Sequence, residues 1–246
     1  RQYTGGYGSV VHSFYGLAQW EYQESVDWIN ENLNTYDMNV EAAIALLEED
    51  GWTLNADGTP YSGSGVRYKD VNGELKPLTI TWCNSEGNPV SELLATMLPE
   101  NMKAAGMELQ PTTTDFATLQ NAMLHATDTQ YNMYNLATGF TQMYDQAFYY
   151  SEDPAYMGTY NNNFILDDEL AQLAWDMVYG VEAGDDAAYL DMWQKFMDRW
   201  NELLPDVPLY SNIYYTVFPD WLQGYDQSSY WDFSQAVLYA SIENAE

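Results

Sequence analysis

Residues 78–83 are Leu-Thr-Ile-Thr-Trp-Cys, a β-branched and aromatic run typical of a buried β-strand. Asn88-Pro89 follows, and an N-cap residue with a first-turn proline predicts a helix, which ends at Gly106. The next three elements are expected to be a strand, a helix and a strand, over residues 107–114, 116–126 and 131–138. This alternation predicts an α/β fold with parallel pairing in a mixed sheet flanked by helices.

The region before this strand carries helix and turn signals. Asn39 is an expected N-cap for a helix over 40–50, and Gly51 supplies the left-handed residue that ends it. Asn72-Gly73 predicts a tight turn in a short hairpin within residues 53–77. Pro99 lies inside the helix that follows Asn88 and is expected to kink or split it.

Two amphipathic helices are expected over 167–180 and 185–204. Apolar residues recur at helical spacing in both, which indicates two core-facing stripes. The stripes comprise Leu170, Leu173, Ala174, Met177 and Val178 in the first helix, and Leu190, Trp193, Phe196, Met197, Trp200, Leu203 and Leu204 in the second. The chain shows no internal repeat and no low-complexity linker.

The charge balance excludes several classes of partner. The sequence has 37 Asp and Glu against 7 Lys and Arg, a net charge of −30. Binding to nucleic acid or to an anionic membrane surface requires clustered basic residues, so neither is expected. Between Lys103 and Lys195 there are 14 carboxylates and no Lys or Arg, so a site in this stretch should prefer neutral or cationic groups. The alternative is a solvated acidic surface that keeps the protein soluble.

Cysteine and histidine usage gives no sign of a catalytic or metal centre. Cys83 lies in the predicted strand and is expected to be a small core residue. His12 and His125 are too far apart in sequence to indicate a metal pair. No nucleophile elbow, HExxH or Walker motif is present, so the chain is not expected to be an enzyme or to need a cofactor.

Several short motifs occur in an order that resembles one family. Residues 36–52, with Tyr36-Asp37 and a helix ending in Gly51-Trp52, are similar to a segment of the oligopeptide-binding family of extracellular solute-binding proteins (family 5). Thr138-Gly139-Phe140 is similar to the Gly-Trp that leads into the ligand cleft of that family. Further similar stretches are residues 77–81, 88–109, 161–170, 204–210 and 229–236.

The resemblance implies one lobe of a type II periplasmic-binding-protein fold. On this interpretation residues 1–246 are a single C-terminal ligand-binding lobe, with an initial segment over 1–35, an α/β core over 36–225 and a tail over 226–246. The chain begins without a signal segment and is taken as a mature or trimmed fragment. A missing N-terminal lobe would complete the cleft, and a lipidated N-terminus upstream would tether the protein outside the cell membrane.

The resemblance also implies a function and a candidate site. The protein would be a monomer that captures a peptide or similar small solute by cleft closure and delivers it to an ABC transporter permease. Met143 occupies the place of an aspartate that pairs with the peptide amino terminus in relatives, so Asp145 is the nearest alternative carboxylate. The candidate ligand-binding residues are Thr138, Gly139, Phe140, Thr141, Tyr144, Asp145, Asn161, Tyr210 and Asn212.

Alternatives remain for the ligand and for individual residues. Aromatic residues also suit sugar rings, so carbohydrate binding is one alternative, and a glycoside hydrolase using two carboxylates is a distant one. Phe140 and Tyr144 would equally fit as core aromatics, and Asn161 as a turn residue.

Overall fold

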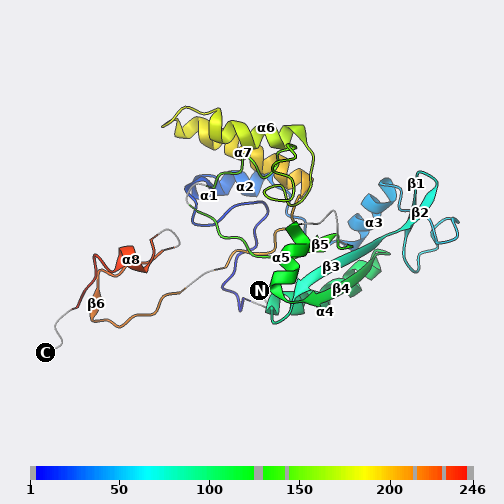
Figure 1. Cartoon of the computed structure of the whole chain (residues 1–246), viewed down its shortest axis with the longest axis horizontal. Helices are drawn as coiled ribbons and strands as arrows, with labels where there is room; N and C mark the ends of the chain where they lie inside the picture. The colour runs from blue at the N-terminus through cyan, green and yellow to red at the C-terminus, as the bar shows by residue number, and fades with distance from the viewer. Residues whose placement is uncertain (1–3, 125–129, 142–143, 213–214, 229–230, 243–246) are drawn as a thin grey trace. The chain divides into compact units, whose positions relative to one another are not determined.

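The computed structural model describes residues 4–124, 130–141, 144–212, 215–228 and 231–242 (Figure 1). The chain forms two compact units. Unit 1 comprises Arg1–Asn34, Thr138–Asp153 and Ile165–Glu246, and unit 2 comprises Thr35–Ala137 and Pro154–Phe164. Each unit is assembled from segments that are distant in sequence.

Unit 2 contains the parallel sheet that the sequence predicts. Strand β3 (Thr79–Ser85) lies in the centre, with β4 (Glu108–Thr114) on one side and β5 (Met133–Tyr134) on the other, both parallel to it. Helix α4 (Pro89–Ala104) packs on β4, and α5 (Phe116–Leu124) packs on β3. Trp82 and Cys83 of β3 are fully buried. The predicted α/β fold with a parallel sheet flanked by helices is confirmed.

The predicted caps and turns of unit 2 are present. The side chain of Asn39 accepts a hydrogen bond from the Ala42 amide at the start of α3 (Val40–Glu49). Trp52 N donates to Leu47 O at 2.8 Å across Gly51, whose φ is +92°. These contacts make a Schellman C-cap. Strands β1 (Tyr68–Val71) and β2 (Glu74–Pro77) pair antiparallel through a two-residue turn with positive φ at Asn72 and Gly73.

Three expectations need correction. Helix α4 continues through Pro99, so the proline does not split it. Strand β5 is much shorter than the predicted 131–138. Beside it, two side-chain amides bind β3: Asn132 Oδ1 accepts from Thr81 N at 2.8 Å and Asn135 Oδ1 from Trp82 Nε1 at 3.1 Å. The initial segment contains two helices, α1 (Trp20–Glu24) and α2 (Val26–Asn32), which its weak periodicity did not predict.

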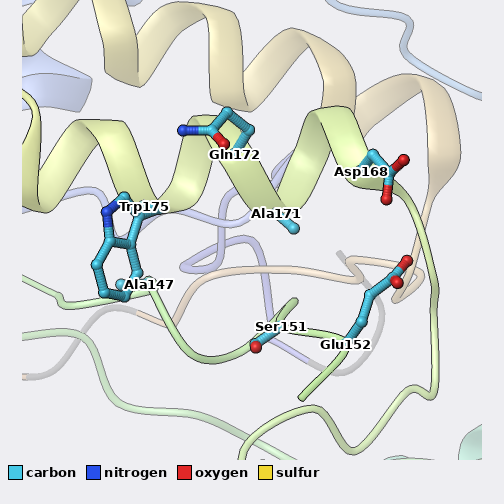
Figure 2. Close-up of a pocket in the computed structure, with 7 residues that line it drawn as sticks. All are labelled: Ala147, Ser151, Glu152, Asp168, Ala171, Gln172 and Trp175. Carbon is cyan, nitrogen blue, oxygen red and sulfur yellow. The ribbon is translucent and has the colours of Figure 1, made fainter.

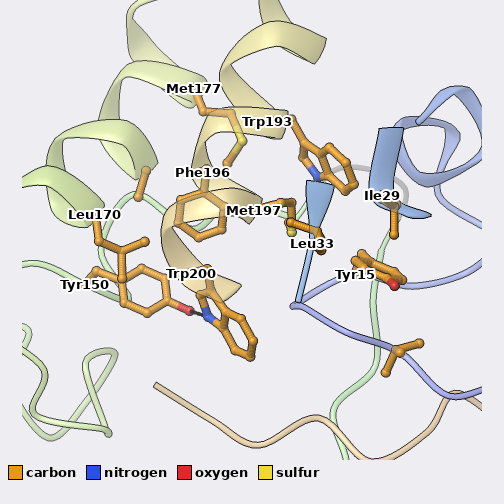
Figure 3. Close-up of a cluster of buried hydrophobic side chains, with 12 residues drawn as sticks. Tyr15, Ile29, Leu33, Tyr150, Leu170, Met177, Trp193, Phe196, Met197 and Trp200 are labelled. Atoms are coloured by element: carbon orange, nitrogen blue, oxygen red, sulfur yellow. Dashed lines mark hydrogen bonds between the residues drawn. The ribbon is translucent and has the colours of Figure 1, made fainter. Parts of the chain in front are cut away.

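Unit 1 has a core built mainly on helices. Helices α6 (Asp168–Tyr179) and α7 (Asp186–Leu203) pack along each other and against α2. Its buried cluster draws on the predicted stripes and on residues from elsewhere in the unit (Figure 3). The cluster comprises Val11, Tyr15, Ile29, Leu33, Tyr150, Leu170, Ala174, Met177, Trp193, Phe196, Met197 and Trp200.

The core of unit 1 also holds the segment that follows residue 138. Trp200 Nε1 donates to the Tyr150 hydroxyl at 2.8 Å, as Figure 3 shows. Burial raises the pKa of Tyr150, so this hydroxyl stays neutral. Residues 144–150 are therefore fixed to α7 by a buried hydrogen bond as well as by packing. The remaining elements of the unit are β6 (Leu222–Gln223), α8 (Phe233–Ala236) and β7 (Ser241–Ile242).

Candidate functional site

Residues 138–141 are attached to the start of the chain within unit 1. Gln19 Nε2 donates to Thr141 O at 3.0 Å, and Gln19 Oε1 accepts from Gly16 N at 2.8 Å. Gln19 is only 3% exposed, so its amide is fixed in this bridging position. A Cβ at Gly16 would lie 2.9 Å from the Cβ of Phe140, so the glycine is needed for this close approach. The bridge therefore fixes the position of Phe140.

Phe140 belongs to a group of four rings, Phe14, Phe140, Tyr144 and Tyr149, which we call the Phe14 cluster. Ring centroids are 4.9 Å apart for Phe14–Phe140, 5.5 Å for Phe14–Tyr144 and 5.6 Å for Tyr144–Tyr149. Phe14 also lies 5.9 Å from Trp200 of the core. All four rings are half-buried. The cluster therefore combines a packed side on the core with partly accessible aromatic surface.

Two hydroxyls and a carboxylate provide the polar groups beside these rings. The hydroxyls of Tyr144 and Tyr149 are hydrogen-bonded at 3.1 Å, and this bond raises the pKa of Tyr149 to about 12, helped by burial and by the charge of Asp145. Asp145 is exposed, and its Oδ1 accepts from Ala147 N at 2.9 Å. Phe140, Tyr144 and Asp145 are thus brought together in one unit, as their positions in the sequence suggested.

A buried acid that the sequence did not single out lies beside Tyr189. Glu21 is 1% exposed and is hydrogen-bonded to the hydroxyl of Tyr189. Burial raises the pKa of Glu21, and its Oε2 has no hydrogen-bond partner among the described residues. The pKa of Tyr189 is raised to about 12 by burial and then by Glu21 and Asp145. Glu21 and Asp145 therefore both act on the Tyr189 hydroxyl through their negative charges.

An open pocket of about 340 Å³ lies between α6 and the preceding loop of unit 1 (Figure 2). Its lining combines two carboxylates, an amide, a hydroxyl and an indole. The lining residues are Ala147, Ser151, Glu152, Asp168, Ala171, Gln172 and Trp175. None of them belongs to the candidate residues that the sequence indicated.

The other sequence-predicted residues lie in different surroundings. Thr138, Gly139 and Thr141 are exposed. Asn161 belongs to unit 2, where it is fully buried and its backbone closes a turn: its N donates to Tyr156 O at 3.0 Å, and its O accepts from Gly158 N at 3.0 Å. This geometry favours the turn role for Asn161.

Tyr210 and Asn212 belong to unit 1 and flank Ser211. Ser211 pairs with Ser9 in an isolated antiparallel bridge. Tyr210 is half-buried and Asn212 is exposed. Met143, which stands in the place of the family's aspartate, lies outside the described residues. The structure thus groups three of the nine candidate residues around the Phe14 cluster.

Three further observations concern the described part of the chain. Within it, no three His, Cys, Asp or Glu side chains are arranged to hold a metal ion. None of its helices is both long enough and apolar enough to cross a membrane. Cys83 is a free thiol whose burial raises its pKa.

Comparisons with known proteins give a family and a fold. The family model "Bacterial extracellular solute-binding proteins, family 5 Middle" matches residues 1–156. A comparison with curated protein sequences gives no match. Many solved structures are similar to this chain, among them the following three. The oligopeptide-binding protein of Thermus thermophilus, complexed with a pentapeptide, has a TM-score of 0.73 and 21% identity over 93% of this chain and 38% of its own.

The other two structures are also similar over most of this chain, at low sequence identity. AppA, the oligopeptide-binding protein of Bacillus subtilis, in complex with a nonapeptide, has a TM-score of 0.69 and 18% identity over 97% of this chain and 43% of its own. A periplasmic oligopeptide-binding protein of Thermotoga maritima, with mannohexaose bound, has a TM-score of 0.62 and 16% identity over 83% of this chain and 36% of its own.

The chain spans less than half the length of each of these structures. At these identities the structural likeness establishes the fold, and it agrees with the match over residues 1–156. The family and these neighbours are binding proteins. The chain belongs to the bacterial extracellular solute-binding proteins of family 5.

Proposed function

We propose that this chain is part of an extracellular solute-binding protein that captures peptides or similar small solutes for an ABC importer. The family match over residues 1–156 carries this proposal. Peptides occupy the neighbours from Thermus thermophilus and Bacillus subtilis, which supports a peptide as the solute. The protein acts by binding and not by catalysis.

The site around the Phe14 cluster has suitable chemistry for a peptide. Half-buried rings offer apolar and stacking surface to side chains, while the exposed carboxylate of Asp145 can pair with an ammonium group. Residues 138–141, with Thr138, Gly139 and Thr141 exposed, provide backbone groups beside the rings. We assign ligand contact to Phe140, Tyr144 and Asp145.

The same proposal includes a second lobe, a membrane tether and a permease. This chain is one lobe, a second lobe of the same protein supplies the opposite wall, and closure of the two buries the solute. The protein works as a monomer, is tethered to the cell surface through an upstream lipidated N-terminus, and delivers its cargo to a membrane permease.

The experiment is a thermal-shift screen of the longer protein that contains this chain, against short peptides, oligosaccharides and cationic metabolites. A ligand that binds the native state raises the melting temperature by mass action. Peptides are expected to give the shift, and Asp145→Asn to weaken peptide affinity about tenfold through loss of a charge-assisted bond. Glu182→Gln, an exposed acid between α6 and α7, is the matched control and should bind as the wild type does.

Carbohydrate is the second candidate solute. The neighbour from Thermotoga maritima holds mannohexaose, and half-buried rings such as Tyr144 can stack on sugars. A shift with oligosaccharides and none with peptides would replace the peptide proposal by this one. A shift with neither would leave both without support.

The isolated chain should bind its solute weakly, because half of the enclosing surface is absent. We expect an affinity at least about 100-fold below that of the longer protein, as measured by isothermal titration calorimetry with the same ligand. Submicromolar binding by this chain alone would contradict the two-lobe proposal.

A further inference from the structure

We propose that the pocket between α6 and residues 147–152 binds a small organic cation carrying an ammonium or guanidinium group. The pocket shares no lining residue with the Phe14 cluster and does not include Asp145. It is therefore a second site, and the proposal goes beyond solute capture.

The two carboxylates of the pocket lie on different elements and converge on one space. Asp168 begins α6, and Glu152 lies in the loop before it; Figure 2 shows both side chains at the same end of the pocket. Their like charges raise the local negative potential. A cation placed between them would relieve that repulsion.

No basic side chain of the described part of unit 1 neutralises these two acids. Lys195 pairs with Asp191 at 2.6 Å. Arg199 pairs with Asp167, Glu169 and Glu202. The acids that neighbour Asp168 in sequence thus have a partner within the chain, while Glu152 and Asp168 are exposed and have no ion pair among the described residues. Both carboxylates are therefore available to a cation from solution.

The opposite end of the pocket is aromatic, which distinguishes it from a merely acidic surface. Trp175 is 45% exposed, with its ring centroid 4.4 Å from that of Tyr179 and 5.9 Å from that of Phe148. This packing holds the indole in place without covering it. An indole face is the best aromatic partner for an organic cation. In the described chain, cations lie over Tyr61 and Trp52 but not over Trp175.

Gln172 adds a directed polar group on the helix between the two ends. Its Nε2 donates to Asp176 Oδ1 at 2.8 Å, which orients the amide and leaves its carbonyl oxygen as an acceptor. Ammonium and guanidinium groups are donors only, and the two carboxylates and this amide oxygen supply acceptors.

The size of the pocket limits the ligand class. A volume of about 340 Å³ lies at the lower end of small-molecule sites. It suits one compact cation with an apolar or aromatic part. Such a molecule would direct its charged end to Glu152 and Asp168 and its apolar part to Trp175.

The test uses the full chain with two probes of the same shape and different charge, benzamidine and benzamide. Isothermal titration calorimetry at low ionic strength should show saturable binding of benzamidine and none of benzamide. Glu152→Gln and Trp175→Leu should each weaken benzamidine affinity about tenfold, because one removes a charge partner and the other the cation–π face. Glu169→Gln is the control, since this acid pairs with Arg199 and does not line the pocket.

The outcomes separate this proposal from its alternatives. Equal binding of both probes, or no saturable binding of benzamidine, would overturn it. A loss of affinity in Glu169→Gln as large as in Glu152→Gln would also overturn it, because it would indicate general attraction to an acidic surface. Peptide binding by the longer protein should be unchanged in Glu152→Gln. If the pocket does not bind benzamidine, the proposal of solute capture therefore still stands. If the longer protein does not bind peptides, the cation proposal for the pocket still stands.

Discussion

At the scale of single residues, Gly16 controls how closely the start of the chain approaches Phe140. A Cβ at this position would lie 2.9 Å from Phe140 Cβ and 3.1 Å from its Cγ. Gly16→Ala should therefore push the ring out of its place and cost about 1–3 kcal/mol in the free energy of unfolding. Urea unfolding of the chain measures this change.

Gly139→Ala is the matched control for this substitution. A Cβ at Gly139 meets nothing within 4 Å, so the unfolding free energy should change by less than about 0.5 kcal/mol. Equal stability of the two variants would show that the close contact between Gly16 and Phe140 is not maintained in solution.

Glu21 should make unit 1 sensitive to pH. Burial raises its pKa in the folded state above the ordinary value. Its contribution to stability is therefore fully present below the ordinary carboxyl pKa and is lost as the pH rises through the folded-state value. Glu21→Gln keeps an acceptor for Tyr189 and removes the charge. The variant should melt above the wild type at about pH 7, by roughly 2–4 °C for each kcal/mol gained, and the difference should shrink at about pH 4.

Glu24→Gln is the control for this pH dependence, because Glu24 lies on the same short helix and is exposed. Its melting temperature should follow the wild type at both pH values. A wild type that is more stable than Glu21→Gln at about pH 7 would mean that the carboxylate has an ionic partner instead of being disfavoured by burial.

The residues of the candidate site differ in how far the sequence could predict them. Phe140, Tyr144 and Asp145 are close in sequence to a motif with a family counterpart, and they lie together in the structure. Glu21 and Tyr189 are 168 positions apart, and neither lies in a motif. Contacts of this range arise from packing, which the local pattern does not specify.

At the scale of elements, the start of α6 combines a helix cap with an ion pair. Asp167 Oδ1 accepts from Leu170 N at 2.8 Å, and Arg199 binds the same carboxylate through Nε at 3.1 Å and Nη2 at 2.5 Å. Asp167→Ala removes both contacts and should cost about 1 kcal/mol or more in the free energy of unfolding. Asp167→Asn keeps the cap and removes only the charge.

The ion pair should disappear in acid. Hydrogen bonds from Arg199 lower the pKa of Asp167, so its contribution to stability is present above the ordinary aspartate pKa and is lost as the pH falls through the lowered value. Urea unfolding should therefore find Asp167→Asn less stable than the wild type at about pH 7 and equal to it at about pH 2. Asp185→Asn, at the N-cap of α7, is the control: Asp185 caps Ala188 N and has no ion pair in the described chain. A pH-dependent loss of similar size in both variants would contradict the assignment to Arg199.

Helix ends and tight turns were the elements best predicted from sequence. Asn39, Asn88 and Asp167 all accept amide hydrogen bonds at the helix starts expected for them. Their chemistry is local, so the pattern of a few residues suffices. The length of β5 and the helices α1 and α2 depend on contacts with segments that are distant in sequence, and the sequence pattern missed them.

At the scale of the whole molecule, the order of the segments along the chain does not show which of them share a core. Unit 1 takes its core from the first 34 residues, from residues 138–153 and from residues after 165. The stripes of α6 and α7 correctly indicated a core, but no periodicity shows that Tyr15 or Tyr150 would complete it. The division of residues 1–246 into an initial segment, a core and a tail stays a prediction.

At the same scale, residues 215–246 expose several apolar side chains, which should bind a fluorescent dye. Val217, Leu238 and Ile242 are 94%, 76% and 70% exposed, and Trp221 and Phe233 are exposed as well. Exposed apolar side chains of this kind can bind hydrophobic dyes. The chain should therefore enhance the fluorescence of an apolar dye such as anilinonaphthalene sulfonate, and removal of residues 215–246 should abolish most of the enhancement. Because the buried cluster of unit 1 lies outside the removed stretch, the truncated chain should keep its helical circular dichroism. Unchanged dye binding with helicity retained would show that the accessible apolar surface lies elsewhere in the molecule.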